Sequence, residues 1–394
     1  MRPLQGFRVL DFSRVLAGPH CGRALADLGA DVVKVEPPDG DLTRFFHPRR
    51  KSMSLYFAQQ NAGKRNVSLD LSRPEATDLL LRLAADVDVV LENFRPGVMT
   101  RMGLGYDEVA AVNPRCVYAS ISGYGQTGPW ANRRAYAPVI HAEMGMIAGR
   151  LAQRPDAGND PFSHADVYAG LEAVGGILAA LLQRERTGRG QHVDVAMAST
   201  LLSVNEHVHN ELESSPTGRG VAPVFETTEG HPVITSVHPA DPGAFELLCQ
   251  AMGRPELLED PRFATVEERV RHRDEVVAEV QAWVRTFDDL EKLEAALATV
   301  RIPLGVVRSV AEVADGEWAK DRGAIAEVSD RGGGTIRIPG PPWRFSDAPE
   351  VGVAGDPAFR GEHNRAVFGE LGLSDADLDR LEAEGVLSSR PPRA

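Results

Sequence analysis

Short apolar runs alternate with amphipathic stretches along the first half of the chain. Between the runs, residues 19–29 and 75–85 repeat apolar side chains at helical spacing. Five apolar runs have the length and composition of buried strands: 7–12, 31–36, 67–71, 86–93 and 116–121. Strands that alternate with helices in this way predict βαβ units and a parallel, doubly wound sheet. Such a sheet binds ligands at the carboxyl ends of its strands.

Two serines occupy positions where helices are expected to begin. Ser72 stands three residues before Glu75, a capping-box spacing, with a proline in the first turn of the helix that follows. Ser163 and Asp166 have the same spacing, so we expect Ser163 to cap a helix whose first turn contains Asp166. A carboxylate in that position faces the positive end of the helix dipole.

The helix expected at 167–188 is apolar nearly all round, which predicts that it is buried. Gly175 and Gly176 in its middle lower the helix propensity and predict close packing of another backbone. A strand at 191–197 and a further helix follow.

The remainder of the chain is a mixture of strand and helix patterns. Residues 213–223 are rich in Gly, Pro and Ser and predict a linker. A smaller mixed region then runs to about residue 320. Later segments return the chain and end in an amphipathic helix with a serine cap. The expected elements are a strand at 230–237, helices at 244–253 and within 268–287, a returning segment at 332–347, and a helix at 374–385.

Length and charge narrow the class of protein. The chain has 394 residues, which predicts two domains, and a formal net charge of −13 at pH 7. An acidic chain repels nucleic acid and anionic membranes, so neither is expected as a partner. The apolar runs look too short for a membrane span, and the polar N-terminal lead does not resemble a signal peptide.

Cysteines and histidines do not predict a metal site. Cys21, Cys116 and Cys249 lie far apart and form no C-x-x-C pair, which favours a cytoplasmic protein without disulfides. His207 and His209 are too sparse to hold a metal, so we expect none.

A glycine motif raises the question of a nicotinamide or flavin cofactor. Gly123, Gly125 and Gly128 spell G-x-G-x-x-G directly after the strand expected at 116–121. The fingerprint also requires a helix immediately afterwards, and the polar residues that follow have no helical apolar stripe. Glu36 stands where a ribose-binding carboxylate would, but the turn before it has one glycine. We therefore expect a strand-end loop that faces an anionic ligand and no permanently bound cofactor.

Several long motifs, taken in order, resemble the family III CoA-transferases, the superfamily of formyl-CoA transferase and alpha-methylacyl-CoA racemase. The resemblance covers nearly the whole chain, including the tail at 361–387. The motifs are LDFSRVLAGP (10–19), GADVVKVEPPDGD (29–41), GKRNVSLDL (63–71), VLENFRPGVMTRMGLGY (90–106), ISGYGQTGPW (121–130) and HADVYAGLEAVGGILAALLQRERTGRGQHVDVAM (164–197).

The resemblance implies an α/β fold in which both chain ends form a large doubly wound domain. Its first part would be 1–212, and 321–394 would return to complete it. Residues 225–320 would form a small α+β domain, and two chains would interlock as a homodimer. The partners it implies are an acyl-CoA thioester and a carboxylic acid, so coenzyme A would be a substrate.

The resemblance also implies which residues contact the CoA substrate. Lysine and arginine suit its phosphates, and Asn93 could hydrogen-bond its amides. For any single cation, a solvated surface charge is the alternative. The implied contacts are Arg14, Val15, Leu16, Ala17, Lys64, Arg65, Asn93, Phe94, Arg101, Gly123, Gly125, Arg134 and Tyr136.

Asp166 matches the family's catalytic aspartate, although a purely structural role in the capping box is the alternative from the residues alone. The resemblance implies covalent catalysis, in which Asp166 forms an aspartyl–acyl anhydride and then an aspartyl–CoA thioester. The thioester bond energy is kept, so neither ATP nor a metal is required.

Two other functions compete with CoA transfer. A racemase on this fold moves the proton beside the thioester carbonyl and needs an acid/base pair. Tyr136 stands where the racemases have a histidine, and its ordinary pKa of about 10 makes it a poor base. His141 and His164 could replace that histidine, although a partly buried structural role is the commoner one. The third hypothesis is a protein that binds CoA without turnover, and the presence of Asp166 argues against it.

Departures from the formyl-CoA transferase pattern concern the substrate. Leu16 replaces a glutamine and Ala137 replaces an acid, and we find no run of four glycines in the 220–270 region. These differences argue against formate or oxalate as substrate, and Leu16 favours a larger or less polar acid.

Overall fold

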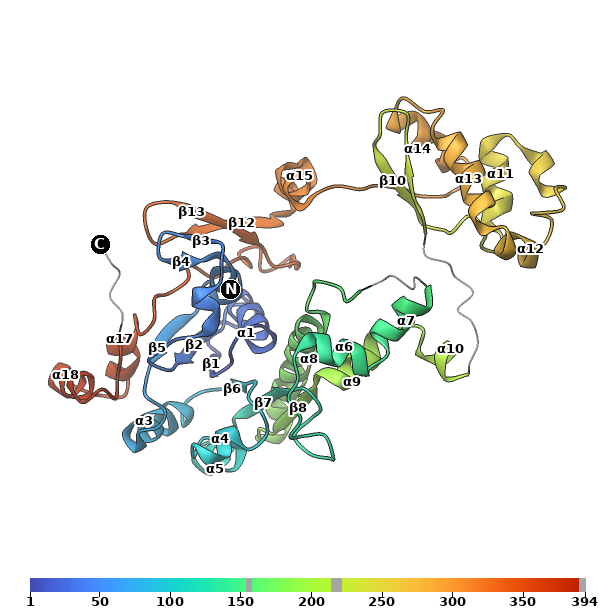
Figure 1. Cartoon of the computed structure of the whole chain (residues 1–394). Coiled ribbons are helices and arrows are strands. Elements are labelled where there is room, and N and C mark those ends of the chain that lie inside the picture. The colour runs from blue at the N-terminus through green and yellow to red at the C-terminus, as the bar shows by residue number, and fades with distance from the viewer. Residues whose placement is uncertain (154–157, 214–221, 390–394) are drawn as a thin grey trace. The chain divides into compact units, whose positions relative to one another are not determined.

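The computed structural model describes residues 1–153, 158–213 and 222–389. The chain forms two compact units (Figure 1). Unit 1 contains both chain ends, as residues 1–149, 157–205 and 317–394, and unit 2 contains 150–156 and 206–316. The domain boundaries expected from the sequence stay a prediction, and most of the expected linker lies outside the described residues.

A six-stranded parallel sheet forms the centre of unit 1 and confirms the expected doubly wound pattern. Counted along the chain, the strand order is 3-2-1-4-5-6, which reverses between β1 and β6. In spatial order the strands are β5 (Arg65–Ser68), β2 (Asp31–Glu36), β1 (Arg8–Asp11), β6 (Val89–Glu92), β7 (Val117–Ser122) and β8 (His192–Ala196).

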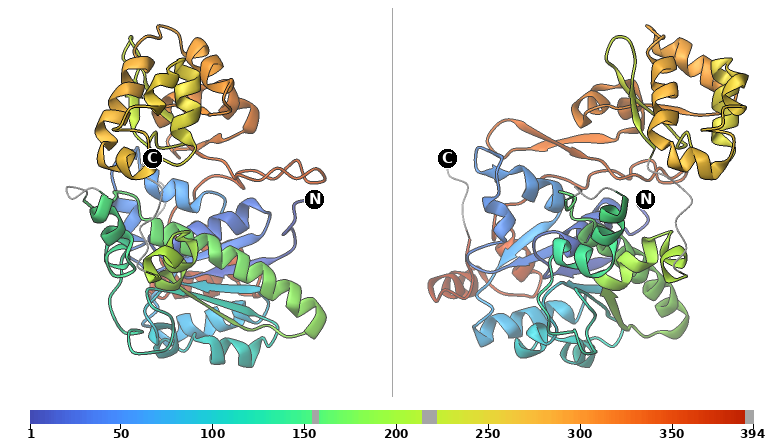
Figure 2. Two further views of the ribbon diagram at one scale, coloured as in Figure 1. Left: turned by 90° about the vertical axis from the view of Figure 1, so that its right-hand side faces the viewer. Right: turned by 45° about the vertical axis from the view of Figure 1, so that its right-hand side comes forward.

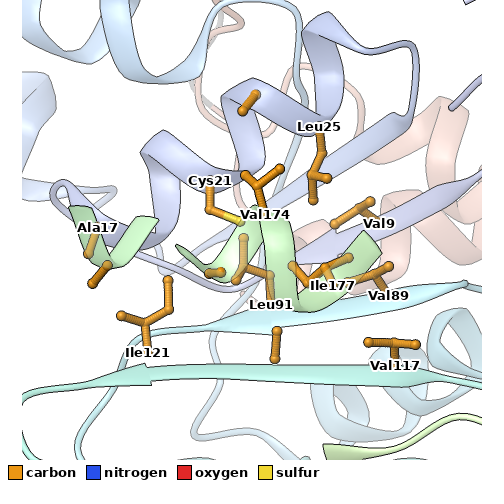
Figure 3. Packing of buried hydrophobic residues seen from close by; sticks show 14 of the residues in the cluster. Val9, Ala17, Cys21, Leu25, Val89, Leu91, Val117, Ile121, Val174 and Ile177 are labelled. Atoms are coloured by element: carbon orange, nitrogen blue, oxygen red, sulfur yellow. The ribbon is translucent and has the colours of Figure 1, made fainter. Parts of the chain in front are cut away.

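Helices cover both faces of this sheet. Figure 3 shows Cys21 and Leu25 of α1 and Val174 and Ile177 of α8 packed over Leu91. Figure 2 shows α8, the long green helix, lying across the strands. This face is covered by α1 (Ala17–Asp27), α6 (Ala137–Glu143), α8 (His164–Thr187) and α9 (Met197–Val204). The opposite face is covered by α3 (Pro74–Ala84), α5 (Tyr106–Val112), α17 (Asn364–Gly369) and α18 (Asp375–Ala383).

The C-terminal segment packs against the edge strand of the sheet. Figure 1 shows α17, in red, beside β5, in blue. The backbone N–H of His363 donates to the carbonyl of Asn66 at 2.9 Å, and that of Ser388 donates to the carbonyl of Ser68 at 3.0 Å. The expected serine cap at Ser374 is confirmed as a complete capping box with Asp377. The two chain ends therefore share one hydrophobic core.

Shorter elements complete unit 1. They are η1 (Leu42–Phe45), β3 (Arg49–Arg50), β4 (Met53–Ser54), α2 (Leu55–Asn61), α4 (Val98–Arg101), α16 (Glu317–Arg322), β12 (Ile325–Ser329) and β13 (Thr335–Pro339). The segment α7 (Met146–Gln153) runs from unit 1 into unit 2.

Unit 2 is a small α+β unit with its own apolar core. Phe225, Val233 and Leu248 are fully buried in it. Its three-stranded antiparallel sheet is formed by β9 (Val224–Glu226), β10 (Pro232–Thr235) and β11 (Leu304–Val306). Its helices are α10 (Val208–Leu212), α11 (Ala244–Met252), η2 (Pro255–Leu258), α12 (Val266–Arg271), α13 (Arg273–Val284), α14 (Leu290–Ala298) and α15 (Val310–Asp315).

The capping box expected at Ser72 is wrong. The helix begins at Pro74, its N-cap is Arg73, and the Ser72 hydroxyl donates instead to Asp70 at 2.6 Å. A turn that hydrogen-bonds locally competes with the cap for the same serine.

The expected burial of the helix at 167–188 is also wrong for part of its surface. One side of α8 packs on α1 and the sheet, while Leu171, Leu178 and Leu182 on the other side are exposed. By length and composition α8 is apolar enough to span a membrane, which corrects the expectation that no run reaches that length. The other side of α8 belongs to the core of unit 1, as expected of a core helix.

The predicted close packing at Gly175 and Gly176 occurs elsewhere in α8. A Cβ at Gly175 would meet no atom within 4 Å, and one at Gly176 would meet only the Val193 side chain. A Cβ at Gly170 would lie 2.6 Å from the carbonyl oxygen of Ala17. Gly170 therefore allows α8 to approach the first turn of α1.

Candidate active site

A cavity of about 600 Å³ opens at the carboxyl ends of β1, β6 and β7, where the strand order reverses. Ligands bind at this kind of position in open α/β sheets, and the volume suits a small-molecule site. Residues 14–17 after β1, 93–96 after β6 and 121–123 at the end of β7 line it, together with residues 133–138 and Asp166.

The structure brings most of the residues singled out from the sequence into this cavity. They come from five separate segments of the chain. Those that line it are Arg14, Val15, Leu16, Ala17, Asn93, Phe94, Gly123, Arg134, Tyr136 and Asp166.

Lys64 and Arg65 do not line the cavity. The Lys64 ammonium is buried and lies 2.9 Å from the Asp11 carboxylate and 2.9 Å from the carbonyl oxygen of Pro19. The side chain of Arg65 pairs with Asp31 and Glu370. Both cations are engaged within the fold, so the geometry gives no support to their predicted contact with CoA.

Arg101 and Gly125 also lie outside the cavity lining. Arg101 is exposed at the end of α4. The backbone N–H of Gly125 donates to the Ser122 hydroxyl at 3.1 Å, which places this glycine in the turn after β7. The helix that a dinucleotide fingerprint needs is absent at this point, because residues 129–136 form no helix and α6 begins at Ala137.

Asp166 lies in the first turn of α8 with its carboxylate held by backbone donors. The N–H groups of Ala137 and Ala17, the first residues of α6 and α1, hydrogen-bond to it. Burial raises the pKa of Asp166 to about 6, and these two hydrogen bonds oppose the rise. Among the described residues we find no ion pair to Asp166. The carboxylate is therefore largely ionised at neutral pH without a cation beside it.

The cap expected at Ser163 is wrong, although Asp166 lies in the first turn as predicted. Ser163 is the N-cap residue of α8, but its side chain makes no cap hydrogen bond. The N–H of Ala165 donates instead to Nε2 of His141 at 3.2 Å. A side chain from α6 thus replaces the local cap.

The turn that carries Ala17 toward Asp166 contains a strained residue. Val15 has a φ of 67°, a left-handed conformation that β-branched residues rarely adopt. The Asn93 side-chain amide makes two hydrogen bonds to the backbone of Arg14, the residue before Val15. Its oxygen accepts the Arg14 N–H at 2.7 Å, and its nitrogen donates to the Arg14 carbonyl at 2.8 Å. The amide expected to bind CoA therefore already holds this turn.

Buried charges hold the same turn from below. The Val15 N–H donates to Asp41 at 3.2 Å, and the Lys34 ammonium donates to the carbonyl of Ser13 at 2.7 Å. Burial by itself would raise the pKa of Asp41, but Lys34 and hydrogen bonds from Thr43 lower it to about 2. The turn is thus fixed by side chains that cannot move into solvent.

Several lining residues were missed from the sequence. Tyr56 is the clearest case, because burial and the charges of Asp166 and Asp41 raise its pKa to about 12, which keeps its hydroxyl protonated. Tyr56 comes from α2, and no motif in the sequence connects that helix with the loops. The other missed side chains include Leu42, Arg95, Arg133 and Met197. Arg95 lies inside the ENFRPG motif, which was a usable signal.

The cavity is positively charged although the chain is acidic. Arg14, Arg95, Arg133 and Arg134 line it, against the one carboxylate of Asp166. Arg133 pairs with Glu143 and lies over the ring of Trp130 at 4.7 Å. Guanidinium groups in such a cluster suit a phosphorylated anion.

The two histidines near Asp166 do not line the cavity. His141 is fully buried, and its ring nitrogens contact Ala165 and Asn159. His164 lies 3.6 Å from Asp160 and stacks on Tyr168. The described residues thus place no histidine pair on either side of a bound substrate. They also contain no group of three or more His, Cys, Asp or Glu arranged to hold a metal ion.

Comparisons with known proteins agree with one another. The model of CoA-transferase family III matches residues 4–364. The chain is 36% identical to a succinyl-CoA–D-citramalate CoA-transferase of Chloroflexus aurantiacus, over 98% of each chain. It is 34% identical to a formyl-CoA:oxalate CoA-transferase of Streptomyces coelicolor, over 98% of this chain and 99% of the relative. The crystal structure of a CAIB/BAIF family protein from Brucella suis superimposes with a TM-score of 0.79 at 34% identity, covering 94% of this chain and 99% of that one.

Proposed function

This chain belongs to CoA-transferase family III, and from that membership we propose that it moves coenzyme A from an acyl-CoA thioester to a carboxylic acid through covalent intermediates on Asp166. Enzymes of this family use CoA thioesters as substrates. The observation that carries the covalent part of the proposal is the Asp166 carboxylate, which lines the cavity and is held by two backbone N–H groups without a cation.

The first half of the reaction makes free thiolate. An Asp166 oxygen attacks the donor thioester carbonyl, the C–S bond breaks, and CoA leaves as thiolate while an aspartyl–acyl anhydride remains. The thiolate then attacks the aspartyl carbonyl of the anhydride, and the donor acid leaves as its carboxylate. CoA is now held as an aspartyl thioester.

The second half reverses these steps with the acceptor. The acceptor carboxylate attacks the aspartyl thioester, and thiolate is released again as a second anhydride forms. The thiolate attacks the acceptor carbonyl of this anhydride, which yields acceptor-CoA and restores the Asp166 carboxylate. No proton is consumed in the cycle, so it needs no acid/base pair.

The N–H groups of Ala17 and Ala137 support this chemistry in a second way. When Asp166 becomes acylated it loses its negative charge, and the two donors are free to bind the oxyanion that develops on a reacting carbonyl. The protonated Tyr56 hydroxyl is a further neutral donor in the same cavity.

In this proposal the arginines that line the cavity bind the phosphates of CoA. Arg14, Arg95 and Arg134 present guanidinium groups where a phosphorylated ligand could reach them. Lys64 and Arg65 are not included in this role, because neither lines the cavity and both pair with carboxylates elsewhere in unit 1.

A racemase is the weaker alternative. Proton exchange needs an acid and a base next to the substrate, and neither His141 nor His164 lines the cavity. Tyr136 does line it and is 70% exposed, but a phenol is a poorer general base than the imidazole that racemases have at this position.

The acceptor is proposed to be a carboxylic acid larger than formate. The relatives named above act on D-citramalate and on oxalate. Leu16 and Leu42 present apolar side chains to this cavity, which suits an acid with a carbon chain. A panel of mono- and dicarboxylic acids, tested with one acyl-CoA donor, ranks the acceptors.

We also propose that the protein is a homodimer, interlocked as in its family. The apolar side chains Leu171, Leu178 and Leu182 of α8 and Leu202 of α9 are exposed in the single chain. Exposed apolar residues at helical spacing mark a protein interface. Light scattering should give twice the mass of one chain.

The covalent step is tested by trapping. The enzyme is incubated with acyl-CoA and then treated with hydroxylamine, and the modified peptide is located by mass spectrometry. We expect a hydroxamate on Asp166 and none in the Asp166→Asn variant. Exchange of the alpha proton with deuterated water, without any adduct, would establish a racemase instead.

A further inference from the structure

The first turn of α8 has an unusual partner. A helix begins with N–H groups that have no acceptor in the helix itself, and a serine at the N-cap ordinarily supplies one. Ser163 does not, and the Ala165 N–H donates instead to Nε2 of His141. Ala165 immediately precedes Asp166, so this bond is made one residue from the proposed nucleophile.

The geometry determines which nitrogen of His141 carries the proton. Nε2 faces a backbone donor at 3.2 Å and must therefore be unprotonated. The proton of the neutral ring is then on Nδ1, which lies 3.2 Å from the amide oxygen of Asn159. Both nitrogens are thus used, one as acceptor and one as donor, and the ring is fully buried.

The same helix holds Asp166 at two points. Ala137, the first residue of α6, donates its N–H to the Asp166 carboxylate, while His141, one turn later, accepts the N–H of Ala165. One bond acts on the reacting side chain, and the other acts on the backbone that carries it. The His141 ring itself does not line the cavity.

We propose that His141 is a positioning residue of the transfer reaction, whose neutral ring, protonated on Nδ1, fixes the first turn of α8 and thereby the direction of the Asp166 carboxylate. This inference rests on the proposed role of Asp166 as nucleophile. It also gives a function to a histidine that the reaction does not use as acid or base.

The first test compares two substitutions at this position. In His141→Gln the side-chain amide can both accept the Ala165 N–H and donate to Asn159, whereas in His141→Leu it can do neither. We expect His141→Leu to lower kcat by about 10- to 100-fold, the scale of a misplacement near 1 Å, with KM for the acyl-CoA unchanged. His141→Gln should keep kcat within about threefold of the wild type, because it restores both hydrogen bonds.

His164→Gln is the matched control. His164 lies 5.8 Å from His141 between ring centres, but its ring pairs with Asp160 and no described backbone N–H of the first turn donates to it. We expect its kcat to stay near that of the wild type. If Gln and Leu at position 141 reduce kcat equally, or if KM rises while kcat stays unchanged, the proposal is overturned.

The second test does not depend on turnover. Nitrogen-15 NMR of the histidine side chains distinguishes a ring protonated on Nδ1 from one protonated on Nε2. We expect His141 to carry its proton on Nδ1, and a proton on Nε2 would overturn the proposal whatever the kinetics show. Failure of the proposed function is recognised separately, because the wild-type enzyme would then form no adduct on Asp166.

Discussion

Two aspartates in unit 1, one fully buried and one half-buried, have opposite surroundings. Asp11, at the end of β1, is fully buried and lies 2.9 Å from the Lys64 ammonium, and it also accepts the N–H of Ser13 at 2.9 Å. Asp166, in the first turn of α8, accepts backbone N–H groups from Ala17 and Ala137, and the described residues place no ion-pair partner beside it. The first carboxylate is neutralised by a cation, and the second is not.

The difference shows how one fold can hold one carboxylate in an ion pair and leave another charged and unpaired, as the proposed nucleophile requires. An ammonium in direct contact neutralises the charge of a carboxylate and lowers its basicity, whereas N–H dipoles stabilise the charge without neutralising it. Burial without a cation raises the pKa of Asp166 to about 6. Such a value retains basicity, and hence nucleophilicity, while most molecules are still ionised at pH 7.

Breaking the inert pair should have the largest effect on stability. Asp11→Asn leaves the Lys64 ammonium buried without a carboxylate, and burial already lowers the pKa of Lys64 to about 8. We expect the variant to lose about 3 kcal/mol of unfolding free energy, measured by urea denaturation. Adding Lys64→Met should recover part of that loss, because no unpaired charge then remains.

The control for this variant is an exposed pair. Asp31 pairs with Arg65, and its side chain is 39% exposed. Asp31→Asn should therefore cost less than about 1 kcal/mol. Equal losses in Asp11→Asn and Asp31→Asn would mean that burial does not distinguish the two pairs.

Neutralising the proposed nucleophile should change the stability in the opposite direction from Asp11→Asn, and by no more than that variant does. The pKa of Asp166 is higher in the folded state, at about 6, than its ordinary value of 3.8, so the folded state binds the proton more tightly. The stability contributed by this group is complete below pH 4 and is lost as the pH rises through 6. Asp166→Asn should therefore be more stable than the wild type by at most about 3 kcal/mol at pH 8 and nearly equally stable near pH 4.

Thermal denaturation of the two proteins across this pH range measures the difference. The variant should show no transferase activity at either pH. If the variant were less stable than the wild type at pH 8, ionisation of Asp166 would not destabilise the folded state, and this prediction would be wrong.

The pH dependence of the reaction tests whether the Asp166 carboxylate must be ionised for transfer. The proposed nucleophile, Asp166, must be ionised to react, so kcat/KM should fall by about tenfold per pH unit below pH 6 and level off above it. Glu92→Gln is the control, because burial raises the pKa of Glu92 to about 7 and this group titrates nearby. The decrease below pH 6 should persist in Glu92→Gln, and its disappearance there would assign the titration to Glu92.

Local pattern was sufficient for most of the fold. The strands at 31–36 and 116–121 and the helix at 75–85 were predicted within one residue, because periodicity and turn residues act over a few positions. Helix starts were less certain. Ser163 and Ser72 both had the spacing of a capping box, and neither forms one, because other polar groups compete for the same donors.

For the candidate site, too, the sequence predicted some residues correctly and missed others. Motifs singled out Asp166, Arg14 and Asn93, which the cavity brings together from three places in the chain. Lys64 lay in an equally clear motif, yet its ammonium points into the core toward Asp11. Tyr56 has no motif and is found only because α2 packs beside the loops.

The amino-acid sequence by itself determined the order of strands and helices, the family, and the aspartate on which the chemistry is proposed to depend. Only the tertiary structure decided which charged side chains form ion pairs within the fold and which face the cavity. This division depends on distances between residues far apart in the chain. The tertiary structure also decided that a histidine from α6, and not the adjacent serine, completes the first turn of α8, because a hydrogen bond requires a donor and an acceptor that meet in space.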